Sequence, residues 1–372
     1  MPDIASGILK LDKNGTGRLR SAERSLRPSP SDVIVPARLM RQYKLAEGAV
    51  TAGPFSVAKG RKELSEVESV CGLKPEEFQK RRPYNDLVAV NPNKRFNLAA
   101  GGQFSMRIID LVAPIGKGTR GLIISPPKAG KTVLLGQIAD AIIYDDPKAH
   151  VIVLLIDERP EEVTSFRRTV KGAEVMASTI DGSIEEHIAL AELMLANIRI
   201  ELECGRDVVI LVDSLTRMGR SFNRRGSGTG RVMSGGVEVG ALEIPRRFFG
   251  MARNVENGGS VTIIATILVD TGSRMDQLIY EEFKGTGNSE IVLDRSLAEA
   301  RIFPAINLSA SGTRKEECLY NPEDSRKLAM MRRVLSSYKP KEVIESLSKL
   351  LKKYPTNKEF LQSMSTEKAV VD

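Results

Sequence analysis

The chain has 372 residues, which is enough for two or three domains with separate hydrophobic cores. Its 41% hydrophobic and 27% charged residues are typical of a globular protein, and no apolar run approaches the roughly 18 residues that a membrane-spanning helix requires. The N-terminus also lacks the basic and apolar segments of a secretion signal, so we expect a cytoplasmic protein with no membrane partner.

Cysteine and histidine usage limits the chemistry further. Cys71, Cys204 and Cys318 are odd in number and far apart, which fits neither a disulfide framework nor a C-x-x-C zinc site. His150 and His187 are the only histidines, which leaves almost no room for a histidine-based metal site or catalytic triad.

The net charge of +8 is concentrated at the front of the chain. Residues 1–100 contain 18 lysines and arginines against 11 aspartates and glutamates, which gives this segment +7 and leaves +1 for the remainder. Such asymmetry indicates that the N-terminal segment meets a polyanion, although a solvated basic surface explains the charge alone equally well.

Residues 1–72 have the pattern of a small all-β domain. Alternating side chains on either side of Asn14-Gly15 predict a β-hairpin. Further short strands are expected over 32–36 and 49–57, with a short helix over 37–43 between them. Several short strands in so few residues predict a small barrel or sandwich, a fold that often binds single-stranded nucleic acid.

Aromatic side chains, on which nucleic-acid bases stack, are scarce in this segment. Tyr43 and Phe55 are the only ones before Phe78, and Thr16 and Arg18 occupy the hairpin where rings would be most useful. Binding by charge therefore fits this domain better than base stacking does.

Residues 73–98 are rich in proline, lysine, arginine and asparagine, as in Lys80-Arg-Arg-Pro-Tyr-Asn85. This composition is typical of a linker, and we place the domain boundary inside it.

From residue 99 to the C-terminus the pattern is that of an α/β domain. Uninterrupted β-branched runs are typical of central parallel strands covered on both faces, and helical patterns such as 184–202 lie between them. Ligands of such sheets bind beyond the carboxyl ends of the strands. The predicted central strands are 121–124, 151–156, 208–212 and 261–267.

The first of these strands leads into Ser125-Pro-Pro-Lys-Ala-Gly-Lys-Thr132, which predicts a phosphate-binding loop. A strand, a glycine-containing turn and a helix N-terminus together aim backbone N–H groups at a phosphate. Lys131 would neutralise the β- and γ-phosphates, and the Thr132 hydroxyl would ligate Mg²⁺. Ser125 stands where the first glycine of this motif is expected.

Acidic residues follow two other predicted strands. Asp213 matches the carboxylate that holds Mg²⁺ through water, and Glu158 is suited to orient the attacking water. The alternatives are a helix N-cap for Asp213 and a solvated loop charge for Glu158. Their order after a phosphate loop favours the ATP-hydrolysing interpretation.

With these motifs in place, the sequence resembles the bacterial transcription termination factor Rho family. Members of this family are ring-shaped, ATP-dependent RNA–DNA helicases with a RecA-like P-loop ATPase domain. Residues 107–317 are similar to its motor domain, and residues 7–70 more weakly to its OB-fold (cold-shock-like) RNA-binding domain. The segments that carry the resemblance are Pro126-Pro-Lys-Ala-Gly-Lys-Thr132, Leu154-Leu-Ile-Asp-Glu-Arg-Pro-Glu-Glu-Val-Thr164, Arg247-Phe-Phe-Gly250, Tyr280-Glu-Glu-Phe-Lys-Gly-Thr-Gly-Asn288 and Ser311-Gly-Thr-Arg-Lys-Glu-Glu317.

The resemblance implies a role for individual residues. Glu158 would be the catalytic carboxylate, Arg159 would couple neighbouring subunits, and Phe303 would pack against adenine. Arg314 matches an arginine finger that reaches the nucleotide of the adjacent subunit. Without the resemblance, a surface arginine is the better interpretation. Nucleotide contacts are implied for Pro126, Pro127, Lys128, Ala129, Gly130, Lys131, Thr132 and Val133.

Two glycine-containing segments match the loops that line the family's central pore and grip RNA. The first is 230–236 and the second is 271–276, where Arg274 stands in place of the usual lysine. Without the family, both are ordinary flexible loops. The residues implied to contact RNA in the pore are Arg231, Ser234, Gly235, Gly236 and Arg274.

The chain also departs from the family. We expect no helical segment ahead of the predicted hairpin, and the residues at the RNA-stacking positions are Thr16, Arg18 and Ile34. Arg18 and Arg20 would then supply charge rather than stacking. Beyond the motor, the helical spacing of Val343, Ile344, Leu347, Leu350 and Leu351 predicts a packing helix.

The sequence therefore predicts a homohexameric ATPase that uses ATP and Mg²⁺, moves along single-stranded RNA and acts on the RNA polymerase elongation complex. Two alternatives remain open. One is a related ring ATPase that works on DNA or drives rotation or export. The other is an RNA-binding assembly that ATP stabilises with little turnover.

Overall fold

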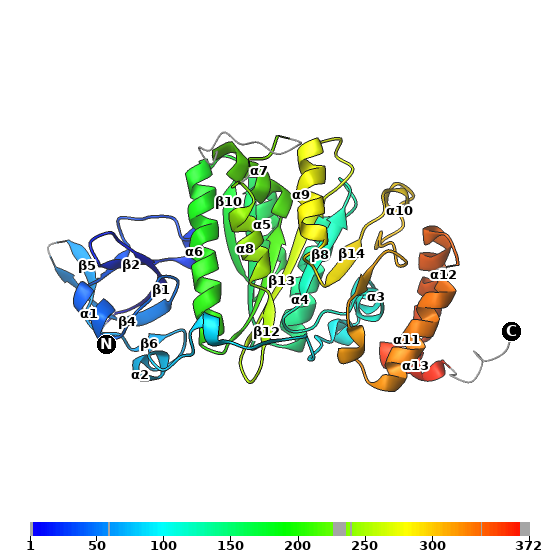
Figure 1. Cartoon of the computed structure of the whole chain (residues 1–372), viewed down its shortest axis with the longest axis horizontal. Helices are drawn as coiled ribbons and strands as arrows, with labels where there is room; N and C mark the ends of the chain where they lie inside the picture. The colour runs from blue at the N-terminus through cyan, green and yellow to red at the C-terminus, as the bar shows by residue number, and fades with distance from the viewer. Residues whose placement is uncertain (1–2, 59, 226–235, 239, 336, 365–372) are drawn as a thin grey trace.

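A computed structural model of the chain describes residues 3–58, 60–225, 236–238, 240–335 and 337–364. It consists of a small N-terminal β domain, a larger α/β domain and three C-terminal helices (Figure 1). The β domain lies beside the long helix α6, and the C-terminal helices lie at the opposite end of the molecule.

The N-terminal domain is a closed six-stranded sheet in the order β1-β2-β3-β5-β4-β6. The predicted hairpin is confirmed, because β1 and β2 pair antiparallel from Ile8↔Arg20 to Leu11↔Gly17. A further β1–β4 pairing closes the barrel around fully buried side chains such as Leu9, Val35 and Leu64. The elements are β1 (Ile4–Leu11), β2 (Gly17–Arg20), β3 (Val33–Val35), α1 (Ala37–Gln42), β4 (Val50–Ala58), β5 (Arg61–Leu64) and β6 (Ser69–Val70).

The predicted linker is built into both neighbouring cores. Phe78, in α2 (Pro75–Phe78), is fully buried with the side chains of the N-terminal domain. Further on, β7 (Ala89–Val90) pairs antiparallel with β12 (Arg253–Val255) of the large sheet. The division into 1–72, 73–98 and 99–372 stays a prediction, and composition alone did not indicate that the linker ends would pack.

The large domain contains a sheet whose main path has the order β10-β9-β11-β13-β8-β14-β15, and along this path all pairs except β14–β15 are parallel. Off this path, β12 pairs antiparallel with β13. The four predicted central strands are confirmed and are buried almost throughout, as uninterrupted apolar runs require. Its strands are β8 (Arg120–Ser125), β9 (His150–Glu158), β10 (Glu174–Thr179), β11 (Asp207–Asp213), β12 (Arg253–Val255), β13 (Ser260–Leu268), β14 (Ser289–Val292) and β15 (Gly312–Thr313).

The helices on the two faces of this sheet pack into two separate hydrophobic cores, one on each face. One core contains α3, α4 and α5 with the C-terminal helices, and the other contains α6 to α9. The helices are α3 (Phe104–Val112), α4 (Lys131–Asp145), α5 (Pro160–Thr169), α6 (Ile184–Glu203), α7 (Leu215–Arg225), α8 (Glu243–Gly250), α9 (Arg274–Lys284), α10 (Arg295–Glu299), α11 (Pro322–Leu335), α12 (Pro340–Lys353) and α13 (Asn357–Ser363). Within the described ranges, none of them has the length and apolar character that spanning a membrane requires.

The predicted C-terminal packing helix is α12. Val343, Ile344, Leu347 and Leu351 are buried against the motor core, as their spacing predicts. Leu350 is 42% exposed, so including it among the packing residues was wrong.

The β domain docks on α6 and on β10 through buried polar contacts. Asn197 Nδ2 donates to the Gly48 carbonyl at 2.9 Å, and the backbone N–H of Ala177 donates to Ser25 Oγ at 2.9 Å. Because these groups are withdrawn from water, separating the domains would leave them without partners.

Replacing Gly48 with alanine tests this docking. Gly48 has φ +91°, and an added Cβ would lie 2.3 Å from the Ala196 carbonyl carbon. We expect a loss of about 2 to 5 kcal/mol in the free energy of unfolding, from the left-handed backbone and the clash with a helix. Gly15→Ala is the matched control, because Gly15 has φ +79° with nothing within 4 Å. Equal thermal shifts in the two variants would contradict the close approach.

Candidate active site

The phosphate-binding loop has the predicted strand–turn–helix geometry. The strand β8 ends at Ser125, and α4 begins at Lys131. Lys128 and Gly130 have left-handed backbone conformations, with φ 65° and 92°, which fold the turn back over the helix N-terminus. Ser125 is buried, and its Oγ donates to the Pro126 carbonyl at 2.8 Å. A serine therefore fits where the motif has glycine.

Asp213 lies at the carboxyl end of β11 and faces the loop. Its carboxylate accepts from Lys131 Nζ at 2.6 and 2.7 Å and from Thr266 Oγ1 at 2.7 Å. Thr132 Oγ1 lies 3.3 Å from the same carboxylate. The N-cap interpretation of Asp213 is wrong, because Ser214 Oγ accepts the N–H of Arg217 in the first turn of α7.

Glu158 ends β9 and is fully buried, so it is not a solvated loop charge. One carboxylate oxygen forms an ion pair with Arg217 at 2.9 Å. The other oxygen, Oε2, is buried without a hydrogen-bond partner. An unpaired buried carboxylate oxygen is costly unless a ligand, a metal or water satisfies it, so this atom indicates that something binds here.

The residues fit a hard divalent cation such as Mg²⁺. Among the described residues, the carboxylates of Glu158, Glu162 and Asp213 have oxygens within 4.8 Å of one another. Thr132 Oγ1 adds a hydroxyl and lies 3.3 Å from Glu162 Oε2. An all-oxygen donor set beside a phosphate loop is the environment that Mg²⁺ favours, and Lys131 shows that the cluster already attracts a cation.

The pKa of Glu158 is raised from its usual value to about 7. Burial is the largest cause, and the negative charge of Asp213 adds to it, whereas Arg217 and Lys131 oppose the shift. A carboxyl with a pKa near neutrality can change protonation state during a reaction at physiological pH.

This shift predicts the pH dependence of ATP hydrolysis. Below about pH 7 Glu158 holds its proton, so it carries no charge and cannot take a proton from the attacking water, and kcat/KM should rise with pH and level above that value. In Glu162→Gln the inflection should move to lower pH, because one neighbouring negative charge is removed. Steady-state rates across the pH range at saturating Mg²⁺ measure both, and an unchanged inflection in the variant would contradict this electrostatic account.

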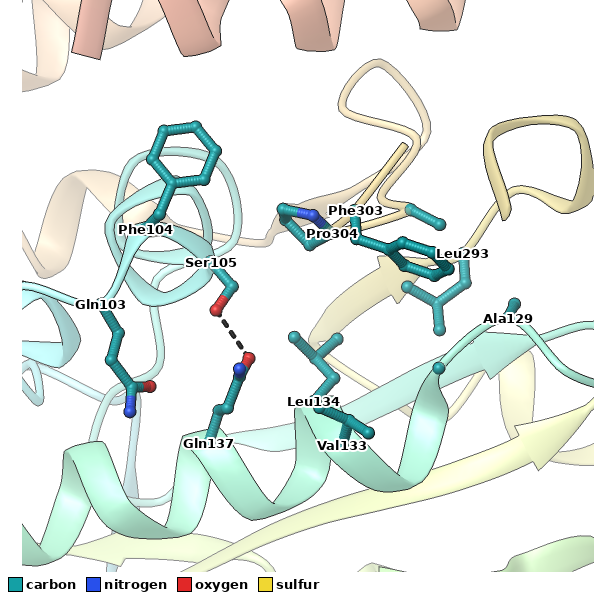
Figure 2. Close-up of a pocket in the computed structure, with 12 residues that line it drawn as sticks. Gln103, Phe104, Ser105, Ala129, Val133, Leu134, Gln137, Leu293, Phe303 and Pro304 are labelled. Carbon is teal, nitrogen blue, oxygen red and sulfur yellow. Dashed lines mark hydrogen bonds between the residues drawn. The ribbon is translucent and has the colours of Figure 1, made fainter. Parts of the chain in front are cut away.

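A largely apolar cavity of about 560 Å³ adjoins the loop. Figure 2 shows the Phe303 ring and Leu293 above the first turn of α4, which contributes Val133 and Leu134. Ser105 Oγ donates to Gln137 Oε1 at 2.6 Å on the opposite side of the cavity. Phe303 is 53% exposed, so its ring is available for stacking on a flat base.

The two arginines for which the family resemblance implies contact with a neighbouring subunit, Arg159 and Arg314, are exposed. Arg159 begins α5 as its N-cap residue. Arg314 follows β15 and lines a separate pocket with Asn288 and Arg332, which has no residue in common with the apolar cavity. In the described part of the chain, the Arg314 side chain has no ion pair or hydrogen bond, so it is free to reach another molecule.

Both arginines of the hairpin form ion pairs within the N-terminal domain. Arg20 pairs with the buried Asp32, and Arg18 Nε lies 3.1 Å from Asp12. Arg18 stands opposite Ile34, which stands opposite Glu63 of β5. The sheet face at the RNA-stacking positions therefore presents an aliphatic side chain and an acid, and the arginines' RNA contacts stay a prediction.

The first predicted pore loop lies mostly outside the described residues, which include neither Arg231, Ser234 nor Gly235. Gly236 is described, and its carbonyl accepts from Asn223 Nδ2 at 3.0 Å. In the second loop, Arg274 is exposed at the start of α9.

Sequence reasoning missed three residues at the site. Glu162 lies in the first turn of α5, four residues after Glu158, and Arg217 lies in the first turn of α7, four residues after Asp213. Thr266 is a polar residue inside the apolar run of β13, and this interruption was the available signal.

Comparison with known proteins agrees with this geometry. Residues 105–313 match the nucleotide-binding domain model of the ATP synthase alpha/beta family, and residues 5–76 match the Rho termination factor RNA-binding domain. Among solved structures, an ATPase of a bacterial type III secretion system superimposes with a TM-score of 0.60 at 24% identity, covering 77% of this chain and 78% of that one. The assembled type III secretion ATPase EscN of enteropathogenic E. coli gives a TM-score of 0.62 at 22% identity, covering 76% of this chain and 73% of that one. At this identity the structures show the fold alone.

Full-length relatives are more informative. The chain is 49% identical over 369 residues to transcription termination factor Rho of Aquifex aeolicus, which covers 97% of this chain and 85% of the relative. It is 46% identical over 367 residues to the factor of the same name from Cereibacter sphaeroides, covering 97% and 87%. Similarity of this extent, together with both domain matches, shows that the chain belongs to the Rho family of transcription termination factors.

Proposed function

We propose that the chain hydrolyses ATP to move 5′ to 3′ along nascent RNA, unwinds the RNA–DNA hybrid and so terminates transcription. One observation carries this proposal: the same chain contains a hydrolysis site and an RNA-binding domain. In the hydrolysis site Lys131, Asp213 and Glu158 lie close together, and the N-terminal domain matches the Rho RNA-binding model. The relatives named above bear the name of transcription termination factors. Such a role places the protein in the cytoplasm, next to the elongating RNA polymerase.

In the nucleotide site, the phosphates of ATP would replace Asp213 as the partner of Lys131. The Lys131 ammonium pairs with the buried carboxylate of Asp213. We propose that with ATP bound Lys131 would contact the β- and γ-phosphates, and that Thr132 and Asp213 would hold Mg²⁺. The metal would supply charge neutralisation at these phosphates. The backbone N–H groups of Lys128, Ala129 and Gly130 would point toward the phosphates.

Glu158 would orient the attacking water through Oε2, the oxygen that lacks a partner. Arg217 holds the other oxygen, so the carboxylate cannot rotate away. Phe303, Val133 and Leu134 would enclose the adenine base and exclude water from it.

We further propose that the active form is a homohexameric ring. The exposed Arg314 side chain would enter the nucleotide site of the next subunit, whose own Arg159 lies at the edge of that site. An arginine supplied in trans makes hydrolysis depend on assembly.

RNA would meet the ring at two places. The basic N-terminal domain would load single strands mainly by charge, and Arg274 with the segment 230–236 would contact RNA in the pore. Two other functions remain to be separated experimentally: a ring ATPase acting on DNA, and an assembly that ATP only stabilises.

Steady-state ATP hydrolysis of the purified protein, with single-stranded RNA, single-stranded DNA or neither, distinguishes these functions. The proposal expects strong stimulation by RNA and weak stimulation by DNA. Stimulation by DNA alone would support the DNA-acting ring. ATP binding without hydrolysis under any condition would support the ATP-stabilised assembly.

A further inference from the structure

Two cysteines meet at the junction between the N-terminal domain and the motor. Cys71 directly follows β6 and is buried in the core of the N-terminal domain. Cys204 is the C-cap residue of α6, and its half-buried side chain packs against the same core. The two thiols are in hydrogen-bond contact with each other. Their wide separation in the sequence gave no sign of this pair.

Hydrogen bonds to both domains hold the backbone of Cys71 in place. Its N–H donates to the Val50 carbonyl at 2.7 Å within the N-terminal domain, and its own carbonyl accepts from Arg206 Nη1 at 3.0 Å. Arg206 follows Cys204 by two residues and forms a 2.9 Å ion pair with Glu201 of α6. The same arginine therefore fixes both sides of the cysteine pair, and a bond between the sulfurs would require little movement of the backbone.

The two cysteines differ in how readily they react. The pKa of the Cys71 thiol is raised well above its usual value, because it contacts the Cys204 thiol, is buried and lies beside the negative charge of Glu201. Cys71 is therefore a protonated and inaccessible thiol in the reduced protein. Cys204 is only half-buried, so we expect a small oxidant to reach its sulfur first.

We propose that Cys71 and Cys204 form a reversible disulfide in the presence of a peroxide, and that this bond fastens the N-terminal domain to the motor. Hydrogen peroxide would oxidise the Cys204 thiol to a sulfenic acid and be reduced to water. The Cys71 sulfur would then attack the Cys204 sulfur, so that the S–S bond forms and the S–O bond breaks. The hydroxide leaves with the Cys71 proton as a second water. The proposal does not depend on the proposed role in transcription.

The disulfide would lie far from the nucleotide site. Strand β11 begins at Asp207, soon after Cys204, and ends at Asp213, which contacts Lys131 of the phosphate loop. A strand of this length spans about 20 Å. Oxidation of the pair should therefore leave ATP hydrolysis without RNA within about twofold of the reduced protein.

Peroxide treatment of a Cys318→Ser protein tests the bond. This change removes the exposed third thiol and leaves Cys71 and Cys204 as the only cysteines. Mass spectrometry of non-reduced peptides should show the two cysteines linked within one chain, and dithiothreitol should release them. The melting temperature of the oxidised protein should be about 3 to 10 °C higher than that of the reduced protein, because the bond restricts the unfolded chain.

Cys204→Ser in the same Cys318→Ser background is the matched control. Serine has nearly the size of cysteine and replaces a half-buried side chain, so we expect this variant to fold. Peroxide should leave its melting temperature unchanged. The Cys318→Ser protein unfolded in guanidinium is a second control that does not depend on how this variant folds. In the unfolded chain the two cysteines are far apart, so the link should form much more slowly than in the folded protein.

Oxidation of Cys204 to a sulfinic acid without a link to Cys71 would overturn the proposal. A link that forms no faster in the folded protein than in guanidinium would also overturn it, because the folded structure would then not bring the thiols together. A link that leaves the melting temperature unchanged would contradict the fastening of the two domains.

Discussion

Glu158→Gln will lower the kcat of RNA-stimulated ATP hydrolysis by about 10²- to 10⁴-fold, the usual contribution of a residue that manages a proton at the reacting centre. The amide keeps the size of the side chain but loses the charge that attracts and orients water. ATP should still bind, because Lys131, Thr132 and the cavity beside Phe303 are unchanged. Single-turnover hydrolysis and fluorescent-nucleotide binding measure the two effects separately.

Glu161→Gln is the control for this change. Glu161 lies in the first turn of α5, three residues after Glu158, but is exposed and outside the carboxylate cluster. Its kcat should match that of the parent. A Glu158→Gln protein that hydrolyses ATP within about tenfold of the parent would remove Glu158 from the proposed role.

Arg314→Ala will lower RNA-stimulated hydrolysis by about 10³- to 10⁵-fold if the arginine stabilises transition-state charge in the next subunit. The exposed side chain and the separation of its pocket from the nucleotide cavity are the structural reasons. Rings should still form, since the Arg314 side chain is exposed and makes no hydrogen bond or ion pair within the described part of its own subunit. Hydrolysis rates together with sedimentation of the variant measure activity and assembly independently.

Mixing two inactive variants tests whether Arg314 acts in trans. A ring assembled from equal amounts of Glu158→Gln and Arg314→Ala subunits would contain about one interface in four with both residues intact. Recovery of hydrolysis on mixing is the expected result. No recovery, in rings shown to be mixed, would mean that Arg314 acts within its own subunit or not at all.

Much of the motor site could be predicted because its residues follow strands that local pattern identifies. The apolar runs of β8, β9 and β11 fix where each strand ends, and parallel strands bring their ends to one edge. Lys131, Glu158 and Asp213 therefore meet as predicted. The partners Arg217 and Thr266 depend on side-chain directions across the sheet, which sequence spacing does not give.

The N-terminal domain was predictable as a fold but less so as a site. The hairpin pattern and the short strands identify the barrel, whereas the pairing of Arg20 with Asp32 brings together residues 12 positions apart through tertiary packing. Composition marked 73–98 as a linker. Composition could not show that β7 would pair with β12 of the large sheet.

Unwinding of an RNA–DNA hybrid tests the central claim most directly. The substrate is an RNA with a single-stranded 5′ tail, annealed at its 3′ end to a labelled DNA. We predict that the protein releases the DNA with ATP, and that it fails with a 3′-tailed RNA or when Glu158→Gln replaces the parent. Hydrolysis stimulated by the tailed RNA without release of the DNA, or equal release from a hybrid with either tail, would contradict a motor that moves 5′ to 3′ along RNA.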